Sequence, residues 1–139
     1  MEAWSAEVHF PDGTVVRAAS LAACDHNAGW RDYGLYLDER WQPAWPAWVV
    51  AWPDFGVPSD AHEAKEAIVQ AYERAQAGER VEIGCAGGMG RTGTVLACLA
   101  ILAGVEDDEA VAWVRRHYHE DAVETPAQEQ WVREFTQAR

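Results

Sequence analysis

Residues 81–103 decide the fold, and they read Val81-Glu-Ile-Gly-Cys85-Ala-Gly-Gly-Met-Gly-Arg91-Thr92-Gly-Thr-Val-Leu-Ala-Cys-Leu-Ala-Ile-Leu-Ala103. The short apolar run at 81–83 predicts a β-strand. From Thr92 to Ala103 the sequence is apolar almost all round and stops at Gly104, which predicts a central helix buried on every side. A glycine-rich loop joins the two elements directly.

This loop has the composition of an anion-binding site. Gly87, Gly88 and Gly90 allow the backbone to curl, so that successive N–H groups converge on one point at a helix N-terminus. At the start of the loop, the thiolate of Cys85 is favoured by the helix dipole, by these donors and by Arg91. We therefore expect Cys85 to be a nucleophile near neutral pH.

The expected ligand of the loop is a tetrahedral oxyanion such as phosphate, sulfate or vanadate. Arg91 can bind two of its oxygens in one plane, and Thr92 can offer a hydroxyl to the sulfur. A small core cysteine would need neither the nearby glycines nor an arginine six positions later, which disfavours a purely structural interpretation. The residues expected to surround the anion are Ala86, Gly87, Gly88, Met89, Gly90 and Arg91.

The rest of the chain predicts an α/β fold, with a small central mixed sheet flanked by helices. Residues 4–10 and 14–18 form a hairpin around Gly13, residues 22–33 are irregular, and residues 48–52 form a buried strand that stops at Pro53. Asp60 and Glu63 form a capping box that begins a helix, and this helix ends at Gly78. Two more helices begin at residue 107 or 108 and at Thr125-Pro126.

Length and charge restrict the function classes. With 139 residues, 49% of them apolar, the chain has enough core for a single domain spanning residues 1–139. Its 11 basic and 23 acidic residues give a formal charge of −12, which repels nucleic acid and anionic membranes. No apolar run reaches signal-peptide length or the ~18 residues of a membrane span, so we expect a cytoplasmic protein.

The cysteines and histidines do not predict a metal centre. Cys24, Cys85 and Cys98 are an odd set without Cys-x-x-Cys spacing, and the histidines are scattered. We expect no metal and no cofactor. Packing accounts for Cys24 and Cys98, although a disulfide with Cys85 under oxidants stays open.

Three motifs together resemble the cysteine-dependent protein tyrosine phosphatases. Cys85-x5-Arg91-Thr92 resembles their signature loop, with its phosphate-binding turn between a strand and a buried helix. Upstream, residues 52–58 (Trp-Pro-Asp-Phe-Gly-Val-Pro) are similar to the mobile loop that supplies the general acid. Downstream, residues 125–128 (Thr-Pro-Ala-Gln) are similar to the segment whose glutamine positions water. The length is that of a compact, atypical or dual-specificity-sized member, and the first fifty residues lie outside the resemblance.

The resemblance implies an enzyme that hydrolyses phosphate monoesters, above all protein phosphotyrosine or a small aryl phosphate. Cys85 would form a cysteinyl phosphate and Arg91 would stabilise the charge. Asp54 would be the general acid in the first step and would take a proton from water in the second, and Gln128 would orient that water. Locally, Asp54 is also an ordinary turn residue and Gln128 also half of a capping box. A phosphatase of small metabolites and a weakly active phosphate-binding module remain alternatives.

Three features need separate interpretation. The family commonly has histidine where this chain has Gly84, which predicts a more flexible loop or a less active thiolate. Residues 86–90 contain no Lys or Arg, which disfavours polyanionic substrates. Four tryptophans precede the acid loop; core packing is the simpler interpretation, and stacking on an aryl substrate is the alternative. They are Trp41, Trp45, Trp48 and Trp52.

Overall fold

The computed structural model describes residues 4–26 and 30–136. Its strands are β1 (Ser5–His9), β2 (Val15–Ser20), β3 (Tyr33–Tyr36), β4 (Ala47–Val49) and β5 (Val81–Cys85). Its helices are α1 (Leu21–His26), α2 (Ala61–Gln76), α3 (Gly90–Leu102), α4 (Ala110–His117) and α5 (Pro126–Arg133). The α/β fold with a small mixed sheet and flanking helices is therefore confirmed.

The strand order creates one edge at which the site is built. The sheet has the order β1-β2-β5-β3-β4, and every neighbouring pair is parallel except β1 with β2. The carboxyl ends of β2, β5, β3 and β4 therefore meet at the same edge. In parallel sheets this is the edge where ligands bind.

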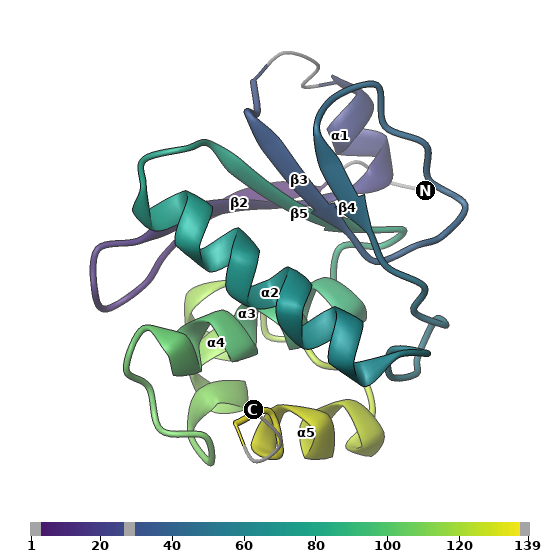
Figure 1. Cartoon of the computed structure of the whole chain (residues 1–139). Coiled ribbons are helices and arrows are strands. Elements are labelled where there is room, and N and C mark those ends of the chain that lie inside the picture. The colour runs from purple at the N-terminus through teal and green to yellow at the C-terminus, as the bar shows by residue number, and fades with distance from the viewer. Residues whose placement is uncertain (1–3, 27–29, 137–139) are drawn as a thin grey trace.

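The two faces of the sheet are covered unequally. Figure 1 shows α2, α3, α4 and α5 gathered on one face and α1 on the other. On the larger side, α3 is buried from Gly90 to Ala100, as its all-round apolar sequence predicts. Alternation along β5 places Val81, Ile83 and Cys85 in this larger core.

Glu82 is fully buried within β5, and a charged network surrounds it. Arg31 donates to its two carboxylate oxygens at 3.0 and 3.2 Å, and the Tyr36 hydroxyl donates at 2.6 Å. The Arg31 guanidinium also lies 4.0 Å from the centre of the Trp45 ring. This ion pair joins β5 to the segment that leads into β3.

Two sequence predictions are wrong in detail. The buried strand at 48–52 is the shorter, half-buried β4, because it lies at the open edge of the sheet. Residues 22–33 are not all irregular, since α1 and the first residue of β3 fall there; residues 27–29 lie outside the described part. Strand β3 has no alternating pattern because all four of its residues are buried.

The predicted helix starts agree better with the structure than the predicted strands do. Asp60 caps α2 by accepting from the backbone N–H of Glu63, and Thr125 caps α5 by accepting from that of Gln128. Glu63 does not complete a capping box in the observed bonds, because its carboxylate accepts from Trp48 Nε1 at 3.3 Å. Helix α4 begins at Ala110, slightly later than the acidic residues predict.

Within the described ranges, no helix combines the length and apolar character that crossing a membrane requires.

Candidate active site

Cys85 is the last residue of β5, at the carboxyl edge of the sheet. Cys85 is 2% exposed, and the Thr92 hydroxyl donates to its Sγ at 3.0 Å. The loop from Ala86 to Met89 then leads directly into α3, which begins at Gly90. The predicted order of strand, glycine-rich loop and buried helix is confirmed, and the hydroxyl of Thr92 lies where it was expected.

Gly88 fixes the far side of this loop. Its φ is +76°, and a Cβ there would lie 2.9 Å from the backbone nitrogen of Ser20 at the end of β2. The Tyr118 hydroxyl donates to the Gly88 carbonyl and accepts from Trp4 Nε1 at 2.8 Å. Burial raises the pKa of Tyr118, so the hydroxyl keeps its proton and remains a donor.

Gly88→Ala is expected to lower the free energy of unfolding by about 1–3 kcal/mol, because a side chain at positive φ also meets the Ser20 backbone. Gly87→Ala is the matched control, since a Cβ there has no atom within 4 Å. Urea denaturation of both variants measures the difference. Equal loss in the two would show that neither the φ angle nor the β2 contact restrains the loop.

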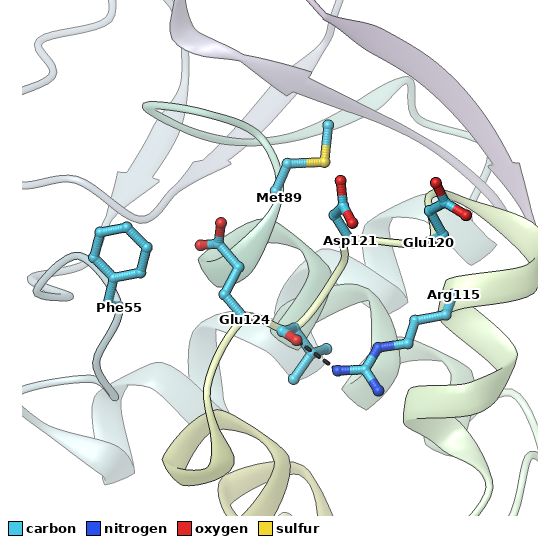
Figure 2. Close-up of a pocket in the computed structure, with 7 residues that line it drawn as sticks. Phe55, Met89, Arg115, Glu120, Asp121 and Glu124 are labelled. Atoms are coloured by element: carbon cyan, nitrogen blue, oxygen red, sulfur yellow. Dashed lines mark hydrogen bonds between the residues drawn. The ribbon is translucent and has the colours of Figure 1, made fainter.

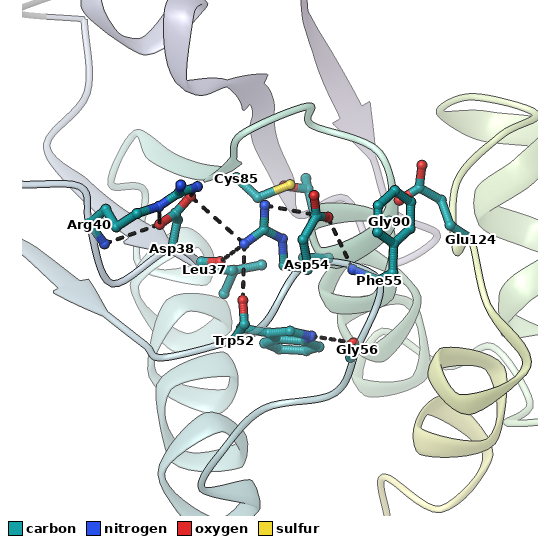
Figure 3. Close-up of polar contacts among 12 residues, drawn as sticks. Leu37, Asp38, Arg40, Trp52, Asp54, Phe55, Gly56, Cys85, Gly90 and Glu124 are labelled. Carbon is teal, nitrogen blue, oxygen red and sulfur yellow. Dashed lines mark hydrogen bonds and ion pairs between the residues drawn. The ribbon is translucent and has the colours of Figure 1, made fainter.

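Two backbone carbonyls bind one nitrogen of the Arg91 guanidinium, which leaves the rest of the group available to a ligand. The residue is 3% exposed, and Nη1 donates to the carbonyls of Leu37 at 3.0 Å and Trp52 at 2.9 Å (Figure 3). Within the described chain, Nε is buried without a hydrogen-bond partner. Nη2 lies 3.6 Å from Asp54 Oδ1. The free N–H groups have the arrangement needed to bind two oxygens of an anion.

Asp38 is a site residue that sequence reasoning missed. It is buried 3.8 Å from Arg91 Nη1, and Arg40 donates to its two oxygens at 2.9 and 2.7 Å. The hydrogen bonds from Arg40 lower the pKa of Asp38, so its charge is maintained beside Arg91. Its position just beyond β3 would have been the signal, had that strand been predicted.

Asp54 lies on a tight turn, with its carboxylate 3.6 Å from Arg91 Nη2 (Figure 3). Gly56 N donates to Pro53 O at 3.0 Å, Trp52 Nε1 donates to Gly56 O at 2.7 Å, and Phe55 takes a φ of +61°. The Asp54 side chain is 58% exposed and close to Arg91. The local turn interpretation is thus correct, and the same turn brings the carboxylate to the anion site.

Gln128 does not face the loop in this structure. It is fully buried; its Oε1 accepts from Glu124 N at 2.8 Å, and its Nε2 donates to Gly56 O at 3.0 Å. The amide thus joins the acid loop to the segment before α5. Its role in orienting water stays a prediction and requires these two bonds to open.

Glu124 is the side chain of that segment which reaches the loop. Its Oε1 occupies the space that a Cβ at Gly90 would need. Burial, and then the charge of Asp54, raise the pKa of Glu124, and Arg91 opposes them. The sequence analysis did not identify Glu124, because this residue precedes the capping motif at Thr125 and belongs to no local pattern.

A hollow of about 580 Å³ opens beside the loop (Figure 2). Arg115, one of the lining residues, donates hydrogen bonds to the backbone carbonyls of Ala122 at 2.9 Å and Val123 at 2.6 Å and so restrains this segment. The rim of the site is mainly acidic, with exposed Glu39, Asp54, Glu120, Asp121 and Glu124. The hollow is lined by Phe55, Met89, Arg115, Glu120, Asp121, Val123 and Glu124.

The structure explains the departure at position 84. A Cβ on Gly84 would lie 3.0 Å from the Tyr36 ring and 3.2 Å from Cys24 Sγ. A histidine therefore cannot enter without displacing Tyr36, which is bonded to the buried Glu82. Cys24 is itself buried and lies in α1, not in a loop.

The tryptophans before the acid loop mainly pack. Trp41 and Trp45 contact Tyr36 at ring distances of 6.1 Å, and Trp52 packs on Trp131 at 5.4 Å. The packing interpretation is correct for these three. The aromatic side chain exposed at the mouth is Phe55, at 60%.

Among the described residues, no group of three or more His, Cys, Asp and Glu side chains is placed to hold a metal ion. Cys98 lies fully buried in α3, and burial raises the pKa of its thiol. The residues brought together at the site are instead a thiol, a guanidinium and carboxylates. Independence from metals and cofactors stays a prediction.

A family comparison fits this geometry. The model described as "Swiss Army Knife protein, DSP-PTPase phosphatase domain" matches residues 49–138, well over half of the chain. The chain belongs to this family. It is a compact phosphatase domain of the dual-specificity type, and the matched range includes Asp54, Cys85 and Gln128.

Similar sequences and structures extend across most of the phosphatase domain. Two uncharacterized proteins of Methanocaldococcus jannaschii are 39% identical over 76% of this chain and 76% of their own, and 30% identical over 87% and 93%. The structure of Tk-PTP in its active form has a TM-score of 0.71 at 28% identity, covering 85% of this chain and 86% of its own. Kinase associated phosphatase (KAP) has a TM-score of 0.65 at 20% identity, covering 84% and 72%, which supports the shared fold.

Proposed function

We propose that this phosphatase domain hydrolyses aryl phosphate monoesters, above all phosphotyrosine in proteins, through a cysteinyl phosphate. The observation that supports a phosphate substrate most directly is Arg91 Nε, which is buried without a hydrogen-bond partner in the described part of the chain. Arg91 directly precedes Thr92, whose hydroxyl contacts the sulfur of Cys85 at 3.0 Å. A buried guanidinium nitrogen without a partner is costly unless a ligand binds it. A phosphate dianion supplies the missing acceptor oxygens.

The reaction would proceed in two displacements. In the first, the Cys85 thiolate attacks phosphorus, the bond to the leaving oxygen breaks, and protonated Asp54 gives its proton to that oxygen. The loop N–H groups and Arg91 stabilise the charge on the other phosphate oxygens. In the second, water attacks phosphorus, the P–S bond breaks, and the Cys85 thiolate is restored as inorganic phosphate leaves.

The mouth of the site favours an aryl ester over a polyanion. Phe55 presents a 60% exposed ring next to Asp54, where the phenyl group of a substrate can contact it. PTPMT1 has been solved in complex with PI(5)P, but it shares only 16% identity with this chain. Here residues 86–90 contain no Lys or Arg and the rim is acidic, which disfavours polyphosphorylated headgroups.

Two peptides of one sequence, carrying phosphotyrosine or phosphoserine, test the substrate. We expect kcat/KM to be at least about fivefold higher for phosphotyrosine, because ring contact contributes roughly 1 kcal/mol or more. Phe55→Ala should reduce this ratio, with Val15→Ala, another exposed apolar residue, as the control. Equal rates on the two peptides would contradict an aryl preference and favour a metabolite or a general phosphomonoester substrate.

Asp54→Ala is expected to slow hydrolysis of phenyl phosphate by roughly 10²-fold or more, because its leaving oxygen needs a proton. The loss with p-nitrophenyl phosphate should be clearly smaller, since nitrophenolate leaves without one. Steady-state kcat on the two esters measures the difference. A uniform loss on both would show that Asp54 acts in binding and not as the acid.

A further inference from the structure

Two carboxyl groups approach the mouth of the loop from different segments. Asp54 comes from the turn after β4, and Glu124 comes from the residue before the N-cap of α5. Figure 3 shows Phe55 between them. In a two-step displacement, the leaving oxygen and later the attacking water occupy the same position opposite the sulfur. The charges of Asp54 and Arg91 both act on Glu124, so both carboxyl groups lie near the anion site at which this proton transfer would occur.

Glu124 is held toward the loop by its surroundings. Its backbone N–H donates to Gln128 at 2.8 Å, and Arg115 fixes the carbonyl of the preceding Val123, whose φ is +63°. Gly90 leaves room for the carboxylate, since a Cβ there would meet Oε1. These contacts restrain the segment, while the side chain itself keeps an exposed, reactive end.

We propose that Glu124, in the role that the resemblance gives to Asp54, is the general base that takes the proton from the water which hydrolyses the cysteinyl phosphate. This inference rests on the proposed function. After the first step, Asp54 has lost its proton and its carboxylate lies 3.6 Å from Arg91, which competes for its lone pairs. Glu124 then receives one proton from water as the P–S bond breaks. Each cycle ends when solvent removes this proton and returns one to Asp54.

The surroundings of Glu124 favour its acting as a base. Burial, Asp54 and Asp121 raise its pKa, and Arg91 lowers it. Arg115 and Glu120 are the other charged side chains of the adjoining hollow. A carboxylate with a raised pKa is a stronger base than an ordinary one. Because Glu124 must be ionised to act, the rate of the second step should fall as pH drops through the raised pKa.

Rapid-quench kinetics with p-nitrophenyl phosphate test the proposal. Glu124→Gln should release about one equivalent of nitrophenol in a normal burst and then turn over roughly 10²-fold more slowly, as loss of a general base predicts. Acid-quenched enzyme should contain phosphate on Cys85. The steady-state rate should no longer depend on the leaving group, and its decline at acidic pH should disappear. Gly90→Ala, which displaces Oε1, should also lengthen the life of the phosphoenzyme.

Glu73→Gln is the matched control, because it removes an exposed carboxylate from α2, away from the site, and should keep both phases unchanged. Thermal unfolding of Glu124→Gln verifies that the fold is intact. A steady-state rate within twofold of the unaltered enzyme, or a slower burst, would overturn the assignment to the second step. If the unaltered enzyme formed no phosphate bond at Cys85, the proposed function itself would fail instead.

Discussion

Cys85→Ser is expected to lower kcat by at least roughly 10⁴-fold, with the fold and oxyanion binding retained. Removal of a covalent nucleophile in other enzymes costs on the order of 10⁶ in kcat, because the partners of the nucleophile have no independent route to the product. A serine hydroxyl keeps the contact with Thr92 but is far less ionised than a thiol at neutral pH. Arg91 and the loop N–H groups are unchanged, so vanadate should still bind.

The measurement combines p-nitrophenyl phosphate turnover with calorimetric titration of vanadate. Cys98→Ala is the control, since this cysteine is fully buried in α3 and makes no contact with the loop in the described bonds. It should lose some stability but retain activity. Hydrolysis by the Cys85→Ser enzyme within tenfold of the original rate would show that another group attacks phosphorus.

Arg31→Met is expected to lower the free energy of unfolding by about 3–5 kcal/mol, because it removes the cation that hydrogen-bonds to the fully buried Glu82. Arg31 supplies two hydrogen bonds to that carboxylate, whereas the nearest nitrogen of Arg17 lies 4.0 Å away. The Tyr36 hydroxyl can share its proton but cannot neutralise the charge. The cost arises from the isolated carboxylate and not from the lost contact itself.

The double variant Arg31→Met/Glu82→Met separates these causes. With both charges removed, most of the lost stability should return, since buried ion pairs contribute little over apolar replacements. Urea denaturation of the three variants, including Glu82→Met alone, gives the coupling energy. If the double variant were less stable than Arg31→Met, the network would stabilise the sheet beyond charge neutralisation.

Local chemistry made part of this fold predictable. The loop around Cys85, helix α3 and the caps at Asp60 and Thr125 depend on neighbouring residues, so their patterns are visible in the sequence. Strand β3 was missed because its residues are buried on both faces. The carbonyls that hold Arg91 belong to Leu37 and Trp52, far from it in the chain. Such tertiary contacts leave no local pattern.

The candidate site shows the same division. Cys85, Arg91 and Thr92 are close in sequence, and the structure places them together. Gln128 and Glu124 are only four residues apart, yet their orientations depend on what the acid loop and the glycine-rich loop leave unoccupied. A capping pattern predicts the start of α5 but not which side chain faces the substrate.

Gln128 also couples the start of α5 to any opening of the 52–58 loop. Its buried amide nitrogen donates a hydrogen bond to Gly56 O. An outward movement of residues 52–58 would therefore leave that nitrogen without a hydrogen-bond partner, unless the start of α5 moved as well. A buried donor without a hydrogen-bond partner costs about 1–3 kcal/mol of free energy. In the proposed reaction, the barrier to product escape would therefore depend partly on a helix that bears none of the reacting atoms.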